Sequence, residues 1–181
     1  MSLEIYIYSL SLLVLLLASM ILYLYKFMYG LLNKKHLYRN DAGLNRGTLF
    51  PLQSLKTFDG KDLTISKEVD GVVIINTSYI CNVCKRIYPF LESIRKEYPN
   101  IQINLLMLAD KEQAKENIEK YNLKSLSVSL IQDEDLHDLG ITTFPFAYLL
   151  SAEGKVIEKG LVNYKKDIDL LISFLPYKKA S

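Results

Sequence analysis

The sequence predicts an α/β protein in which a mixed β-sheet, flanked by helices, follows a single transmembrane helix. Three observations predict this class. The first is an apolar stretch without charge from Ile5 to Tyr25. The second is an alternation of short apolar runs with helical patterns from residue 71 onward, and the third is a hairpin pattern near the C-terminus. Parallel strands joined by helices and followed by a hairpin give a mixed sheet with helices on both faces.

The N-terminal stretch predicts a transmembrane anchor over residues 1–29. At 1.5 Å per residue, the segment from Ile5 to Tyr25 is long enough to cross a hydrocarbon core of about 30 Å. A cleaved signal peptide fits less well, because the positive n-region and a small-x-small cleavage site are missing. A buried core helix is the other alternative. Tyrosines near both ends fit an aromatic belt at the membrane interfaces: Tyr6, Tyr8, Tyr23 and Tyr25.

The chain of 181 residues then allows one domain, with a net charge of +2 that gives no indication of a nucleic-acid partner. Residues 30–47 are polar and predict a solvated linker, residues 48–176 predict the domain, and residues 177–181 a short tail. Asp59-Gly60 is a turn signal, and a short strand-like segment follows at 63–65. These two features predict an entry hairpin.

Five later segments predict strands, at 71–76, 101–108, 126–131, 146–150 and 156–161. The first is apolar and β-branched, as expected of a central strand buried on both faces. Helical patterns predict four helices: one beginning at Lys85 and kinked by Pro89, one capped by Asp110 and Gln113, a short one at 134–139, and one ending before Pro176.

The first of these strands leads into Cys81-Asn82-Val83-Cys84, which contains the only two cysteines of the chain. This placement puts the pair on a strand-to-helix turn. Free N–H groups and the macrodipole at a helix N-terminus stabilise a thiolate, which lowers its pKa and makes it a nucleophile. The second cysteine is close enough to form a disulfide with the first. The pair therefore predicts a dithiol redox site.

The sequence offers little support for other uses of the two cysteines. A zinc site would need further ligands, but only His36 and His137 are present, and they lie in no ligand-like cluster. Covalent haem would need a histidine directly after the second cysteine, where Lys85 stands. An inert structural disulfide stays open as an alternative. We therefore expect no cofactor and no metal.

Several residues together resemble the thioredoxin superfamily over roughly residues 48–176. These are the cysteine pair after a buried strand, Lys85 and Pro89 behind it, Pro145 opening the hairpin, and Glu153-Gly154-Lys155 at the hairpin tip. The resemblance implies a cis Phe144–Pro145 bond with the Phe144 backbone beside the disulfide. It also implies that Cys81 is the nucleophile and Cys84 the resolving cysteine.

Within the superfamily, the Cys-x-Val-Cys-Lys motif, the strand Pro-Phe-Ala-Tyr-Leu-Leu and residues 159–163 are similar to the MauD family of membrane-anchored accessory proteins for methylamine dehydrogenase maturation. This resemblance implies a thiol-disulfide oxidoreductase acting on exported client proteins, with a redox partner in the membrane. The chain departs from thioredoxin in three ways. Val83 replaces the usual proline, Ile80 the usual tryptophan, and the strand at 72–76 contains no carboxylate that could deprotonate Cys84.

Two functions follow as hypotheses. The first is a membrane-tethered enzyme that forms, reduces or isomerises client disulfides through a mixed disulfide. The second is a non-catalytic accessory module that holds a client on an apolar rim: Tyr79, Ile80, Val83 and Phe144. Lys and Arg after the anchor favour a cytoplasmic domain by the positive-inside rule. We nevertheless expect an extracytoplasmic domain, because persistent disulfides form in oxidising compartments.

Overall fold

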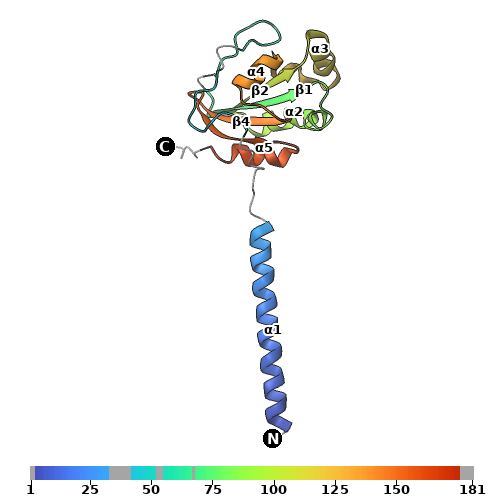
Figure 1. The fold of residues 1–181 in the computed structure, drawn as a ribbon, viewed down its shortest axis with the longest axis vertical. Helices are drawn as coiled ribbons and strands as arrows, with labels where there is room; N and C mark the ends of the chain where they lie inside the picture. The colour runs from blue at the N-terminus through green and yellow to red at the C-terminus, as the bar shows by residue number, and fades with distance from the viewer. Residues whose placement is uncertain (1–2, 33–41, 52–54, 67, 176–181) are drawn as a thin grey trace. The chain divides into compact units, whose positions relative to one another are not determined.

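The computed structural model describes residues 3–32, 42–51, 55–66 and 68–175 (Figure 1). The chain divides into two compact units, residues 1–36 and 37–181. The division falls inside the predicted linker.

The first unit contains helix α1 (Leu3–Leu32). Its stretch Ile5–Met28 is long and apolar enough to cross a membrane, judged by length and composition. The helix covers the predicted span and continues a few residues beyond it. Because leucine, isoleucine and valine surround the helix on all sides, it has no polar face to turn to water.

The second unit contains a five-stranded sheet in the order β3-β2-β1-β4-β5 (Figure 1). Neighbours β1, β2 and β3 are parallel, while β4 is antiparallel to both β1 and β5. The predicted mixed sheet is confirmed. The strands are β1 (Gly71–Ser78), β2 (Ile101–Leu108), β3 (Ser127–Ile131), β4 (Phe146–Ser151) and β5 (Val156–Leu161).

Central strand β1 is buried along its whole length, as predicted. Its side chains alternate between two cores on opposite faces of the sheet. Val73 and Ile75 belong to the core that also contains Cys84, whereas Val72 and Ile74 belong to the other. A continuous β-branched run is therefore what this position needs, because both faces exclude water.

Three helices cover the face of the sheet that carries the cysteines: α2 (Tyr88–Glu97), α3 (Lys111–Lys120) and α5 (Lys165–Ile172). The other face is covered by α4 (Asp133–Asp138) and by the segment that precedes β1; Figure 1 shows α2 and α5 on one side of the sheet and α4 on the other. The predicted capping box of α3 is confirmed. Asp110 accepts the Gln113 N–H at 2.8 Å, and the Gln113 side chain accepts the Asp110 N–H at 3.2 Å.

Two local predictions are wrong. The helix expected from Lys85 is instead a short 3₁₀ helix, η2 (Cys84–Arg86), followed by α2. Pro89 lies in the first turn of α2, where its missing N–H costs nothing, so it does not kink a helix interior. The expected strand at 63–65 does not form either. The Asp59-Gly60 turn does form, closed by an isolated bridge between Lys56 and Asp62.

The predicted linker extends too far toward the C-terminus, because residues 42–47 are packed on the sheet. Gly43 N–H donates to the Gly140 carbonyl at 2.7 Å, and Leu44 N–H donates to the Tyr148 hydroxyl at 2.9 Å. Arg46 forms a bidentate ion pair with Glu158 of β5, in which Arg46 Nη2 lies 2.5 Å from Glu158 Oε2. These partners are more than 90 residues away in sequence, so no local pattern indicates them.

Candidate functional site

The two cysteines follow the C-terminal end of β1. Tyr79 N–H donates to the Leu108 carbonyl at 3.1 Å, which continues the parallel pairing with β2 by one residue. Cys81 N–H then donates back to the Ser78 carbonyl at 3.1 Å and closes a tight turn. Backbone bonds on both sides thus fix where Cys81 stands.

Cys81 and Cys84 form a disulfide with a Cα–Cα distance of 5.3 Å. The two sulfurs have different surroundings. Cys84 is fully buried in the core shared by β1 and α2, whereas Cys81 is only partly buried at the edge of that core. Cys81 is therefore the more accessible of the two sulfurs, and its role as the attacked cysteine stays a prediction.

The Cys81 sulfur accepts the Cys84 N–H at 3.1 Å. Cys84 is the first residue of η2, so its N–H is one of those that a helix start leaves without a partner inside the helix. A hydrogen bond from such an N–H to a sulfur favours a thiolate over a thiol, because donors to a charged acceptor stabilise the charged form.

Tyr79 stands beside the pair, held by two charged side chains. Its hydroxyl donates to Glu116 Oε2 at 2.7 Å, and the Lys85 ammonium lies 5.4 Å from the centre of its ring. The hydrogen bond to Glu116, followed by the charge of that carboxylate, raises the pKa of Tyr79. Sequence analysis missed Glu116, because 37 positions separate it from Tyr79 and its place on α3 is that of an ordinary surface residue.

The predicted apolar rim contains residues of different exposure. The Ile80 side chain is 81% exposed and Val83 is 37% exposed, whereas Tyr79 and Phe144 are partly buried. An isoleucine so exposed next to a reactive disulfide gives an incoming chain an apolar contact. Its role in client binding stays a prediction.

The Phe144–Pro145 bond is cis, as the resemblance implied. Phe146 directly follows and pairs with Asn76 of β1, and the Asn76 side-chain amide donates to the Phe146 carbonyl at 3.1 Å. The start of β4 therefore lies beside the C-terminal end of β1, the end that leads to the cysteines. The contribution of Phe144 and Pro145 to binding stays a prediction.

No carboxylate lies on β1, and the core around Cys84 is apolar apart from a few hydroxyls. One of these belongs to Tyr88, four positions after Cys84, and burial raises its pKa to about 12. Tyr88 is therefore neutral at physiological pH and is a poor base. The structure thus offers no evident proton acceptor for Cys84 among the described residues.

A metal site has no support in the part of the chain that the structure describes, which contains no group of three potential metal-ligating side chains. His137 lies on the surface, with its side chain 98% exposed. His36 lies outside the described residues.

Comparison with known proteins gives no matching family model. The chain is 21% identical over 136 residues to methylamine utilization protein MauD of Methylophilus methylotrophus, an alignment that covers 72% of this chain and 63% of MauD. The chain thus spans less than two thirds of the length of that relative.

Solved structures resemble the second unit. The thioredoxin domain of a thiol-disulfide oxidoreductase from Bacteroides vulgatus matches with a TM-score of 0.61 at 19% identity, covering 74% of this chain and 99% of that one. A thiol:disulfide interchange protein from Bacteroides sp. matches with a TM-score of 0.61 at 21% identity, covering 75% and 93%. These findings confirm the thioredoxin-like fold and the predicted resemblance to MauD and to thiol-disulfide oxidoreductases.

Proposed function

We propose that this thioredoxin-like chain is a membrane-tethered thiol-disulfide oxidoreductase that exchanges the Cys81–Cys84 disulfide with cysteines of exported client proteins. One observation carries the proposal. The Cys81 sulfur is partly exposed and accepts the Cys84 N–H, whereas the sulfur of Cys84 is buried. Such asymmetry suits a pair in which one cysteine meets the client and the other resolves the complex.

In the oxidising direction, a client thiolate attacks Cys81 Sγ, and the electron pair of the broken S–S bond leaves on Cys84. A second client thiolate then attacks the client sulfur of the mixed disulfide and releases Cys81 as a thiolate. The client loses two electrons and becomes a disulfide, while the enzyme gains them and becomes a dithiol. The reverse sequence reduces a client disulfide, and the compartment decides the direction.

The Cys84 N–H assists the second step, in which Cys81 leaves as a thiolate. It lies 3.1 Å from the Cys81 sulfur and is already in place in the disulfide form, so no rearrangement is needed when negative charge develops there. Protonation of Cys84 in its apolar core would come from the client or from solvent, because no carboxylate of β1 is available.

The alternative function is a non-catalytic module that binds a client during its maturation. The absence of a carboxylate on β1 favours this reading, since Cys84 lacks a base that would speed its attack. In that case the pair would be a structural bridge, and the exposed Ile80 would serve binding alone.

Redox titration of the full chain in detergent against glutathione separates the two functions. An oxidoreductase should have a reduction potential well above about −300 mV and a Cys81 pKa below about 8.5, read from the pH dependence of alkylation. A potential below about −300 mV together with an unshifted thiol pKa would support the structural bridge.

The proposal places the domain outside the cytoplasm, where client disulfides persist. Protease added to intact protoplasts should digest the domain, whereas a cytoplasmic marker protein should survive. Protection of the domain until lysis would place it in the cytoplasm. The pair would then be kept as a dithiol and would act as a reductant.

A further inference from the structure

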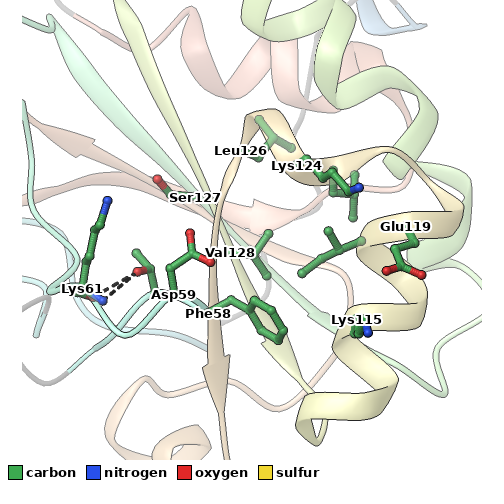
Figure 2. Close-up of a pocket in the computed structure, with 12 residues that line it drawn as sticks. Phe58, Asp59, Lys61, Lys115, Glu119, Lys124, Leu126, Ser127 and Val128 are labelled. Atoms are coloured by element: carbon green, nitrogen blue, oxygen red, sulfur yellow. Dashed lines mark hydrogen bonds between the residues drawn. The ribbon is translucent and has the colours of Figure 1, made fainter.

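A cavity of about 480 Å³ lies away from the cysteines, between the 57–61 loop, α3 and the start of β3 (Figure 2). It has the size of pockets that bind small ligands or single peptide segments. None of the residues that line it is a cysteine or a member of the apolar rim. It therefore needs an explanation separate from disulfide exchange.

The wall of this groove is apolar and comes from the 57–61 loop, α3, the 3₁₀ helix η3 (Leu123–Ser125) and β3 with the residue before it: Phe58, Ile118, Leu123, Leu126 and Val128. The last four are part of the buried core, and Phe58 packs against them. Figure 2 shows the Phe58 ring below Val128, with α3 closing the opposite side. An apolar side chain entering the groove would thus extend the core.

Charged side chains surround the opening: Asp59, Lys61, Lys115, Glu119 and Lys124. Among the residues that the structure describes, none of these five side chains forms an ion pair or a side-chain hydrogen bond. Three ammonium groups against two carboxylates leave the opening positive. Unpaired charge around an apolar depression suits a partner that provides acidic groups beside an apolar one.

The backbone beside the groove indicates the shape of that partner. β3 is an edge strand, and the chain segment before β1 pairs with only part of it. Phe58 N–H donates to the Val128 carbonyl at 2.5 Å, and Thr57 bridges antiparallel to Ser129. The chain then turns away at Gly60, whose φ is +81°.

The groove starts where this pairing stops, beside Leu126 and Ser127. Leu126 is extended, with φ −104° and ψ 150°, and its N–H already donates to the Leu123 carbonyl at 3.0 Å. An extended segment beside Leu126 and Ser127 would therefore be held mainly by its side chains in the groove and by few backbone bonds to the strand edge.

We propose that this groove binds an extended segment of a partner polypeptide in which acidic residues flank an apolar one. The apolar side chain fills the space over Ile118 and Val128, and the acidic residues lie against Lys115 and Lys124. The segment needs no cysteine, so this docking is independent of the disulfide. It would hold a client protein while the client's cysteines reach Cys81.

The test uses the full chain in detergent micelles and fluorescence anisotropy of a fluorescein-labelled Glu-Val-Leu-Val-Glu peptide. Saturable binding is expected, and a Lys-Val-Leu-Val-Lys peptide should bind more weakly. The double variant Lys115→Glu, Lys124→Glu should weaken binding by about tenfold.

Lys120→Glu is the matched control, because Lys120 lies on α3 with Lys115 but does not line the groove. This variant should bind the peptide as tightly as the wild type does. Absence of saturable binding, or equal loss in the control, would overturn the proposal. Binding of dodecanoate in place of the peptide would also overturn it and assign the groove to a small amphiphilic anion. Because the peptide lacks cysteine, a Cys81→Ser chain should bind it equally well, which separates this result from the redox function.

Discussion

The cysteine end of the domain and the attachment of residues 42–47 to the sheet are built in opposite ways. At the cysteine end, residues 78–84 form their own turn with hydrogen bonds that span three residues. The attachment instead joins Gly43, Leu44 and Arg46 to residues near 140, 148 and 158. The first region exposes a reactive sulfur, whereas the second buries a carboxylate and a phenol.

This difference means that the cysteine end serves the chemistry, whereas the attachment serves the stability of the fold. A local turn contributes little to the fold, since its bonds close within a few residues, but it sets the position of Cys81. The attachment contributes no reactive group, but it fixes where the chain leaves the domain and covers the β4–β5 edge. Mutations at the cysteine end should therefore change disulfide exchange, whereas mutations at the attachment should change the free energy of unfolding.

The largest effect is expected at the cysteine end. Cys84→Ser leaves Cys81 to attack a client disulfide without a resolving thiol, so the mixed disulfide should accumulate and appear as a band on non-reducing gels. Cys81→Ser should trap nothing. Unfolding of both variants should match that of the reduced wild type. Equal trapping by the two variants would contradict the assigned roles.

The next effect is expected at the attachment. Arg46→Ala leaves the Glu158 carboxylate, whose side chain is 8% exposed, without its guanidinium, and should lower the free energy of unfolding by about 2 kcal/mol. Exchange activity per folded molecule should not change. Arg95→Ala removes an exposed pair with Glu92 and serves as the control, with no measurable change in denaturant midpoint.

A smaller effect is expected from Tyr148→Phe, which removes the hydroxyl that accepts from Leu44 and donates to the Leu139 carbonyl. The loss should be about 1 kcal/mol by chemical denaturation at neutral pH. Retention of full stability would mean that the two hydrogen bonds of the Tyr148 hydroxyl add nothing measurable to the attachment.

The same variant has a pH signature. Burial raises the pKa of Tyr148 to about 12, against an ordinary value of 10.0. The unfolded phenol therefore ionises first, so this contribution to stability is complete below pH 10.0 and is lost as pH rises toward about 12. Tyr88 behaves in the same way. Tyr148→Phe should remove part of the alkaline decline, measured by denaturation at a series of pH values.

The smallest effect is expected from Glu116→Gln at the cysteine end. Loss of the carboxylate should bring the pKa of Tyr79 back toward its ordinary value, as followed by absorbance titration of the phenol. The exchange rate should change by about twofold or less, because charges exposed to solvent are screened. A change of about tenfold would show that Glu116 acts on Cys81 through Tyr79.

The sequence by itself determined the parts of this protein whose causes are local. Five β-branched or alternating runs gave strands close to their predicted bounds, because strand periodicity and turn residues act within a few positions. The capping box of α3 and the placement of Cys81 and Cys84 after β1 were predicted for the same reason. The cis Phe144–Pro145 bond followed from the resemblance and not from the residues alone.

Tertiary structure decided what depends on distant contacts. Residues 42–47 look like a polar linker, but their bonds to Gly140, Tyr148 and Glu158 place them on the sheet. Pro89 was expected inside a helix, yet packing of Cys84 starts α2 late enough for Pro89 to lie in its first turn. The Tyr79–Glu116 bond and the groove beside β3 arise only when α3 folds against the sheet, because no spacing along the chain encodes which surface residues then meet.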